Sequence, residues 1–165
     1  MLLPPETVPL HGDRPAISVV IPARNEAESI EGCLRSIDRQ DLEREAFEIV
    51  VVDGNSTDDT VAIAEQYADA VFVQRRSGIG GARRDGAEAA RGDVLVFTDA
   101  DSSFEPGWLP AIAENLILQG YDVSTGPILF REGTWRSDLL QLWRKVYTLM
   151  NYFTLYRLIG PNIAI

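Results

Sequence analysis

The stretch Val94-Leu95-Val96-Phe97-Thr98-Asp99-Ala100-Asp101 places two aspartates, one residue apart, at the end of an apolar run. The apolar run predicts a buried β-strand over residues 94–98. Because residues i and i+2 of an extended chain project to the same side, we expect Asp99 and Asp101 to present their carboxylates together. Such a pair suits Mg²⁺ or Mn²⁺, which prefer oxygen ligands and leave positions open for water and phosphate. The alternative interpretation is a turn and helix cap, sites where Asp and Ser are common.

A second acidic strand end occurs earlier in the chain. Residues 47–52 form a β-branched run that stops at Asp53, and residues 54–60 have the composition of a turn followed by a helix start. Either Ser56 or Thr57 is the expected cap of that helix. Asp53 is not explained by the turn, and an ionised carboxylate only accepts hydrogen bonds. We therefore expect Asp53 to suit a ligand with a ring N–H, such as uracil or guanine.

Segments with strand and helix periodicity alternate along the chain. The expected strands cover residues 17–21, 47–52, 70–73 and 94–98, and the expected helices begin near residues 30, 59, 80 and 106. The helix from Pro106 should run to about Gln119 and end at Gly120. This order predicts an α/β fold of Rossmann-like type, a mainly parallel sheet with helices on both faces. Ligands of such sheets bind beyond the carboxyl ends of the strands, where the acidic residues above would lie.

Four segments, in this order, resemble motifs of the family 2 glycosyltransferases, which have the GT-A fold. They are residues 21–26 (IPARNE), 52–60 (VDGNSTDDT), 81–86 (GARRDG) and 98–101 (TDAD). The resemblance covers about residue 16 to the end of the chain. It implies a domain that binds a nucleoside-diphosphate sugar, UDP- or GDP-linked, through Mg²⁺ or Mn²⁺ and transfers the sugar with inversion to an acceptor. One departure is Arg84, which stands where the family often has Asn.

The resemblance also implies roles for individual residues. These are nucleoside contacts at Pro22, Arg24 and Glu26, a base contact at Asp53, a diphosphate contact at Arg83, and a metal and ribose pair at Asp99 and Asp101. Of the last pair, Asp101 is the expected direct metal ligand. The acidic general base of the family lies in a further segment, so we expect it beyond Ile165. A different class of function, a nucleotide-sugar-binding or oligomerisation fragment without turnover, is the alternative.

Composition limits the remaining possibilities. The chain has 165 residues and a net charge of −10, which argues against a nucleic-acid polymer as partner because phosphate binding needs a basic face. We expect a flexible lead over residues 1–15 and one domain over residues 16–165. The single cysteine, Cys33, excludes an internal disulfide and is expected in the core. The start of the chain lacks the pattern of a signal peptide, which predicts a cytoplasmic protein.

Residues 137–159 form an aromatic-rich segment with helical character, interrupted by charged and polar residues such as Arg144 and Lys145. A spanning helix needs roughly 20 predominantly apolar residues, so this segment is not expected to cross a membrane. The default expectation is packing in the core or between the subunits of a homo-oligomer. The alternative is an amphipathic helix on the inner face of the membrane, or one that lines the site of a lipid-linked acceptor.

Overall fold

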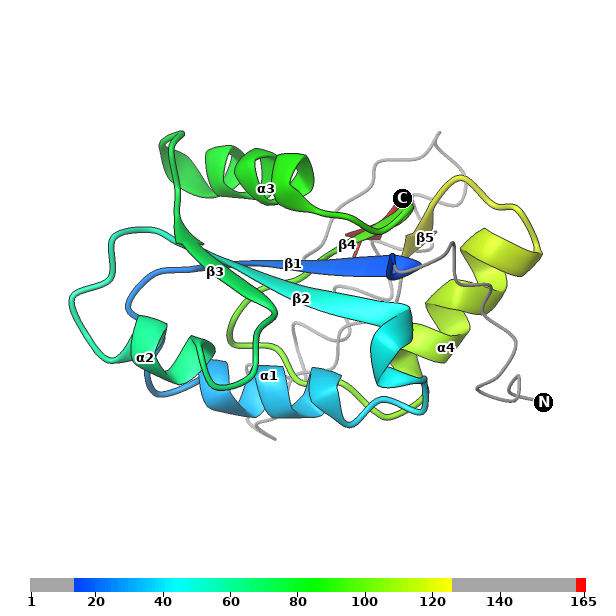
Figure 1. Cartoon of the computed structure of the whole chain (residues 1–165), viewed down its shortest axis with the longest axis horizontal. Helices are drawn as coiled ribbons and strands as arrows, with labels where there is room; N and C mark the ends of the chain where they lie inside the picture. The colour runs from blue at the N-terminus through cyan, green and yellow to red at the C-terminus, as the bar shows by residue number, and fades with distance from the viewer. Residues whose placement is uncertain (1–13, 126–162) are drawn as a thin grey trace, which may run out of the picture. The chain divides into compact units, whose positions relative to one another are not determined.

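The computed structural model describes residues 14–125 and 163–165, which are coloured in Figure 1. The strands are β1 (Ile17–Ala23), β2 (Phe47–Asp53), β3 (Ala70–Val73), β4 (Val94–Phe97), β5 (Ser124–Thr125) and β6 (Ile163–Ala164). Their order in the sheet is β3-β2-β1-β4-β6-β5. The pairs β1–β2, β1–β4 and β2–β3 are parallel, and β6 joins β4 antiparallel. The expected mainly parallel sheet is confirmed.

Helices cover both faces of this sheet. They are α1 (Ile30–Asp38), α2 (Thr60–Ala64), α3 (Gly78–Ala89) and α4 (Trp108–Ala113), with short turns of helix η2 (Arg44–Ala46) and η3 (Glu114–Leu118). Figure 1 shows α3 on the face of the sheet opposite to α1 and α2. Because both faces are covered, the central strands are mainly apolar, and every residue of β2 is buried.

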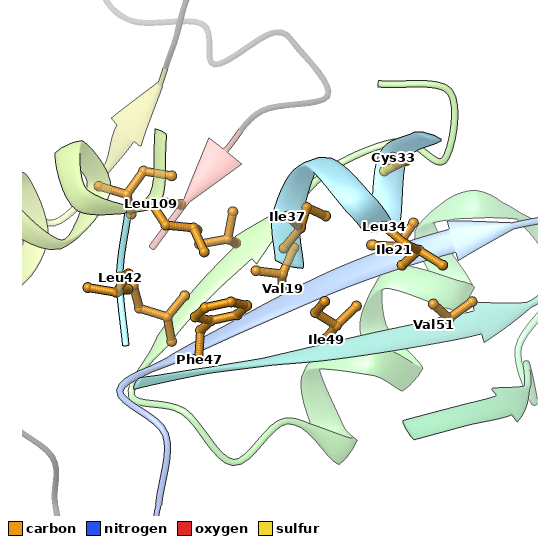
Figure 2. Packing of buried hydrophobic residues seen from close by; sticks show 14 of the residues in the cluster. Val19, Ile21, Cys33, Leu34, Ile37, Leu42, Phe47, Ile49, Val51 and Leu109 are labelled. Carbon is orange, nitrogen blue, oxygen red and sulfur yellow. The ribbon is translucent and has the colours of Figure 1, made fainter. Parts of the chain in front are cut away.

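The core has a separate cluster of side chains on each face of the sheet. The larger cluster joins β1 and β2 to α1 and α4 (Figure 2). Its members include Val19, Ile21, Leu34, Ile37, Ile49 and Leu109. The smaller cluster contains Val20 and Val52, which pack against Ala82 of α3. Successive residues of a strand point to opposite faces, so β1 contributes to both clusters and positions α1 and α3 relative to one another.

Three helix starts differ from the sequence prediction by one or two residues. The helix expected near residue 80 is α3, which begins at Gly78. The helix expected from Pro106 begins at Trp108, continues as the π-helical turn η3, and is followed by Gly120 with a φ of +71°. The helix expected from residue 59 is α2, which has only five residues. Neither Ser56 nor Thr57 caps α2. The carboxylate of Asp58 instead accepts the backbone N–H of Thr60 at 3.1 Å.

The first described residue, Arg14, is hydrogen-bonded to a residue far along the chain. Arg14, which falls in the lead expected over residues 1–15, donates two hydrogen bonds to the carbonyl of Arg91, at 3.1 and 2.7 Å. The aromatic-rich segment 137–159 and residues 1–13 lie outside the described residues. In the part of the chain that the structure describes, no helix combines the length and apolar character needed to cross a membrane.

Candidate functional site

The carboxyl ends of β1, β2 and β4 lie at one edge of the sheet, here called the carboxyl edge. Parallel pairing sets Ala23 beside Asp53 and Val20 beside Phe97. Asp53 is therefore the last residue of β2 at this edge, and Asp99 follows two residues after the end of β4. The β1–α1 loop (residues 24–29) and the β2–α2 loop (residues 54–59) leave the same edge. Topology thus brings the predicted site residues to one side of the sheet.

Asp53 is buried, with 3% of its surface exposed. Its carboxylate oxygens accept the backbone N–H of Ser56 at 3.1 and 3.2 Å, so the side chain stabilises the turn that follows β2. The sequence interpretation missed this structural role. An ionised carboxylate has about four acceptor positions, and one N–H occupies only part of that capacity. Asp53 therefore retains acceptor capacity for a ligand while its orientation is set by the turn.

The β1–α1 and β2–α2 loops are joined by hydrogen bonds between residues about 30 positions apart. The backbone N–H of Asn25 donates to Ser56 Oγ at 2.9 Å, and Asn25 Oδ1 accepts the backbone N–H of Thr57 at 2.8 Å. Two further contacts follow along the same loops, from Glu26 N–H to Thr60 Oγ1 at 2.8 Å and from Ala27 N–H to Asp58 Oδ2 at 3.1 Å. The two loops therefore form one hydrogen-bonded unit at the carboxyl edge.

The three residues predicted to border a nucleoside have different surroundings. Pro22 is half-buried within β1, and Arg24 is exposed at the start of the β1–α1 loop. Glu26 is half-buried, and its carboxylate accepts the hydroxyl of Ser29 at 2.6 Å. Since that carboxylate already has a partner next to the start of α1, its contribution to the loop is at least partly structural. Arg24 is the freest of the three to reach a ligand.

Arg83 and Asp99 form an ion pair between α3 and the end of β4. Arg83 Nη2 lies 2.9 Å from Asp99 Oδ1, and about a third of each side chain is exposed, 30% and 35%. Arg83 Nε is buried and has no hydrogen-bond partner within the described part of the chain. Asp101 is exposed, and among residues 14–125 no hydrogen bond to its carboxylate is found. The ion pair thus orients Asp99, whereas the carboxylate of Asp101 is exposed to solvent.

Cys33 lies beneath this strand end. Its thiol donates to the carbonyl oxygen of Asp99 at 3.6 Å. Burial, together with the nearby charges of Asp101 and Asp99, raises the pKa of Cys33 to about 12. A thiol with this pKa stays protonated at neutral pH and is a poor nucleophile. The expectation that Cys33 belongs to the core is confirmed, and its side chain supports the backbone that carries Asp99.

The described residues contain no group of three or more His, Cys, Asp or Glu side chains arranged to hold a metal ion by themselves. The predicted metal ligands at the carboxyl edge are the carboxylates of Asp99 and Asp101. Magnesium is usually held by one or two protein carboxylates together with substrate phosphates and water. This donor set therefore fits a divalent cation that binds with a diphosphate, and it does not fit a site that would hold a metal without one.

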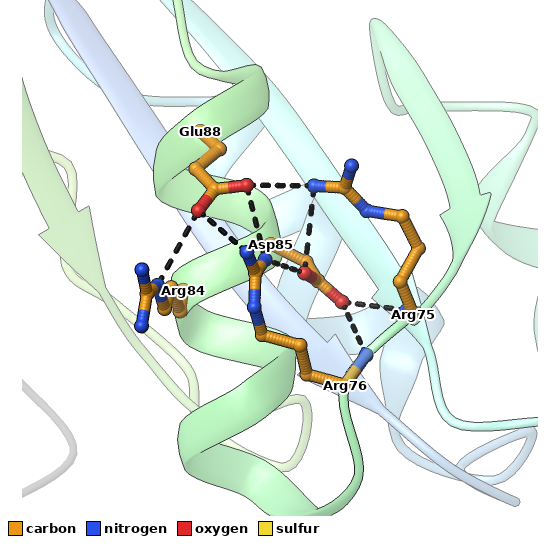
Figure 3. Close-up of polar contacts among 5 residues, drawn as sticks. All are labelled: Arg75, Arg76, Arg84, Asp85 and Glu88. Carbon is orange, nitrogen blue, oxygen red and sulfur yellow. Dashed lines mark hydrogen bonds and ion pairs between the residues drawn. The ribbon is translucent and has the colours of Figure 1, made fainter.

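A network of charged side chains anchors α3 (Figure 3). Asp85 is fully buried and accepts the backbone N–H groups of Arg75 at 2.6 Å and Arg76 at 2.9 Å. The guanidinium of Arg76 pairs with both Asp85 and Glu88, and Arg84 donates to Glu88. Asp85 therefore ties the β3–α3 loop to the helix that carries Arg83. The sequence interpretation missed Asp85, although an acidic residue next to Gly86 on the buried face of a helix was a signal.

The hydrogen bonds of this network lower the pKa of its acids. The backbone N–H of Arg76 is the largest cause for Asp85, and the side chain of Arg76 is the largest cause for Glu88. Both carboxylates are therefore ionised at neutral pH, which keeps the network charged. Arg84, at the position where the resemblance departs from the family, points its guanidinium to Glu88 on the exposed side of α3. The presence of Arg84 in place of the Asn common in the family therefore leaves the ion pair between Arg83 and Asp99 intact.

Comparison with known proteins identifies the family of this chain. The sequence model described as Glycosyl transferase family 2 matches residues 18–165. The chain belongs to glycosyltransferase family 2. The family expected from the four motifs is thereby confirmed.

Relatives of this family 2 chain support the same conclusion. Glycosyltransferase AglE of Haloferax volcanii is 34% identical over 122 residues, which cover 70% of this chain and 40% of AglE. The S. aureus TarS structure (residues 1–349) in complex with UDP-GlcNAc superposes with a TM-score of 0.61 and 28% identity, over 70% of this chain and 38% of TarS. The mannosyltransferase PcManGT from Pyrobaculum calidifontis, in complex with GDP-Man and Mn²⁺, gives a TM-score of 0.54 and 34% identity, over 61% and 32%.

These comparisons confirm the GT-A fold, and they show how much of each relative this chain covers. The chain spans less than half of the length of each of the three relatives described. The roles assigned to Asp53, Arg83, Asp99 and Asp101 stay predictions.

Proposed function

We propose that this domain binds a UDP- or GDP-linked sugar at the carboxyl edge, with Mg²⁺ or Mn²⁺ held by Asp99 and Asp101, and transfers the sugar to an acceptor with inversion. The observation that carries the proposal is the ion pair of Arg83 with Asp99 just after β4, two residues before the exposed Asp101. The family supports it, since the TarS structure contains UDP-GlcNAc and the PcManGT structure contains GDP-Man and Mn²⁺.

The proposed position of the diphosphate follows from Arg83. Its Nε–H group is buried without a partner in the described residues, a state that is rare for buried donors. Because 30% of the Arg83 side chain is exposed, an incoming phosphate oxygen would pair with the guanidinium charge from the open side. A bound divalent cation would neutralise the negative charge that develops on the leaving diphosphate. Arg83 would add a fixed positive charge from α3, while its pair with Asp99 orients that carboxylate.

The proposed base contact follows from Asp53, which is buried next to the β1–α1 loop and only accepts hydrogen bonds. The ring N–H of uracil or guanine offers such an acceptor a donor. Cytosine and adenine present an unprotonated ring nitrogen at the corresponding position, which would face a carboxylate. Arg24, Pro22 and Glu26 would border the nucleoside along the same edge. The preference expected from one unpaired buried polar group is about 1–3 kcal/mol.

The segment over residues 137–159 lies outside the described residues. Its proposed role, contact between subunits or with a lipid-linked acceptor at the inner face of a membrane, rests on the amino-acid sequence. The site at the carboxyl edge does not depend on that role, because its residues all precede residue 102.

Calorimetric titration tests the proposal. The 165-residue chain is titrated with uridine, guanosine, cytidine and adenosine diphosphates, in Mn²⁺, in Mg²⁺ and in EDTA. We expect UDP or GDP to bind best, with metal-dependent affinity. Asp101→Asn should remove the metal dependence, because a neutral amide is a poorer ligand for a hard cation. Asp41→Asn makes the same charge change at an exposed aspartate just after α1 and should bind like wild type.

Two results would contradict the proposal. If the wild-type chain binds no nucleoside diphosphate with either metal, the donor site is not at this edge. If Asp101→Asn binds with unchanged affinity and unchanged metal dependence, the metal assignment is wrong even though a nucleotide site exists.

A further inference from the structure

Asn25 connects the two loops at the carboxyl edge with both its backbone and its side chain. Its N–H donates to Ser56 Oγ at 2.9 Å, and its Oδ1 accepts the N–H of Thr57 at 2.8 Å. Its φ is +55°, in the left-handed region that non-glycine residues rarely adopt. Such a conformation persists where the surrounding structure over-determines it. The contacts of Asn25 with the β2–α2 loop supply that constraint.

Ser56 links Asn25 to the buried acid of the proposed base site. Its hydroxyl accepts from Asn25, and its own backbone N–H donates to the carboxylate of Asp53 at 3.1 and 3.2 Å. The position of the β1–α1 loop, transmitted through Ser56, therefore determines which of the carboxylate's acceptor positions are used and which remain for a ligand. Asn25 does not reach Asp53 itself, so its influence acts through Ser56.

The loops have further connections that do not involve Asn25. Glu26 N–H donates to Thr60 Oγ1, and Ala27 N–H donates to Asp58 Oδ2. These contacts hold the loops together near the start of α2 when the Asn25 side chain is removed. Asn25→Gly keeps the backbone N–H that donates to Ser56 Oγ and loses the side-chain oxygen that accepts the N–H of Thr57. Loss of that side-chain contact would loosen the Ser56–Thr57 turn while leaving the fold of the sheet and helices intact.

We propose that Asn25 is a positioning residue that sets base selectivity at this edge. Its side chain on Thr57 and its N–H on Ser56 Oγ hold the Ser56–Thr57 turn, whose N–H orients Asp53. The inference rests on the proposed function, because it assigns the selectivity of the same donor site. A carboxylate held in one orientation discriminates between a ring N–H and a ring acceptor. A carboxylate that rotates freely can turn either oxygen, or a bound water molecule, toward either kind of base. The difference in affinity between bases with a ring N–H and bases with a ring acceptor then falls.

The chain offers a matched control. Asn55 has nearly the same backbone conformation, with a φ of +63°, and is exposed in the β2–α2 loop. In the described structure its side chain makes no hydrogen bond that joins the two loops. Asn55→Gly and Asn25→Gly thus both place glycine in a left-handed position that glycine adopts readily, and only the second removes a connection between the loops.

The experiment compares four chains: wild type, Asn25→Gly, Asn25→Asp and Asn55→Gly. The measured quantity is the ratio of the dissociation constant of the disfavoured diphosphate (CDP or ADP) to that of the favoured one (UDP or GDP), in Mn²⁺, by calorimetry. We expect Asn25→Gly to lower this ratio about tenfold. Asn55→Gly should stay within about twofold of wild type, because the loop connection is intact.

Asn25→Asp is the conservative variant. Aspartate tolerates the left-handed region and keeps an oxygen that accepts the N–H of Thr57. Its added charge weakens all four diphosphates alike, so the ratio of affinities should be restored even if each affinity is lower. A residue with a merely structural role would alter urea unfolding without altering the ratio. Ser56→Ala, which removes only the hydroxyl that accepts from Asn25, should lower the ratio in a chain that keeps Asn25, and it provides the test if Asn25→Gly fails to fold.

The outcomes separate this inference from the function on which it rests. The inference is wrong if the wild-type chain binds UDP or GDP selectively and both Asn25→Gly and Ser56→Ala are equally selective. The proposed donor site is unaffected by that result. An equal loss of selectivity in Asn55→Gly also overturns it, because that change leaves the connection between the loops intact. A wild-type chain that binds no diphosphate, or all four equally, overturns both the inference and the assignment of Asp53 to the base.

Discussion

Replacing Gly86 by alanine tests how closely α3 lies on the sheet. A Cβ at this position would lie far inside the contact distance of Val20 Cγ1 and 3.0 Å from Val52 Cγ2. Ordinary carbon contacts are about 3.5–4.0 Å, so either α3 must retreat or the valines must turn. Val20 and Val52 are fully buried, and β-branched side chains have few rotamers to exchange. We therefore expect α3 to move.

The expected magnitude combines two opposing effects. Alanine in a helix interior is favoured over glycine by about 1 kcal/mol. Overpacking of a core costs about 1–3 kcal/mol, and the upper part of that range applies because two buried side chains are met at once. The free energy of unfolding should fall by about 1–2 kcal/mol. Because Arg83 lies on the same helix, the retreat should also lengthen its ion pair with Asp99 and weaken metal-dependent diphosphate binding.

Urea unfolding followed by far-UV circular dichroism measures the stability change. Gly80→Ala is the matched control within α3, because a Cβ there would have nothing within 4 Å. It should leave the stability unchanged or raise it by up to about 1 kcal/mol. If Gly86→Ala is as stable as wild type or more stable, the close contact of α3 with β1 and β2 is wrong. Similar losses in both variants would instead indicate a general effect of alanine in this helix.

Two further predictions concern buried titratable groups. The pKa of Asp85 is lowered, so its contribution to folding is complete above the ordinary value of 3.8 and is lost as the pH falls below it. Asp85→Asn, compared with Asp41→Asn, should therefore show a flatter decline of unfolding free energy from about pH 5 to about pH 2, and parallel curves would exclude Asp85 from the acid response. Because burial raises the pKa of Cys33 to about 12, the thiol should resist an aromatic disulfide reagent at pH 8 until urea unfolds the chain. Rapid labelling of the folded chain would show that the strand end carrying Asp99 is not packed as described.

Local features of the sequence were sufficient for the strands and for the edge at which the site lies. The apolar runs that predicted β2 and β4 form strands, because their length and composition suit a sheet covered on both faces. β2 is buried throughout, and β4 alternates buried and half-buried residues. Asp53 and Asp99 come directly after such runs, so the parallel order of strands was enough to bring them to one edge. Helix boundaries were less well predicted, since the start of α2 depends on the carboxylate of Asp58 rather than on Ser56 or Thr57.

The partners of individual side chains were decided only by the tertiary structure. Asn25 meets Ser56 because β1 and β2 are neighbours in one register, although the residues are 31 positions apart. Asp85 binds the backbone of Arg75 and Arg76 because α3 turns back over the sheet. The sequence marks Asp85 as an acid on the buried face of a helix, but it does not identify these partners. Hydrophobic periodicity indicates which residues are buried, because removing apolar surface from water is favourable. That driving force is non-directional, so it does not select the partner of an individual side chain. Hydrogen bonds and ion pairs act over a few ångströms, so they depend on the packed positions of segments far apart in the sequence.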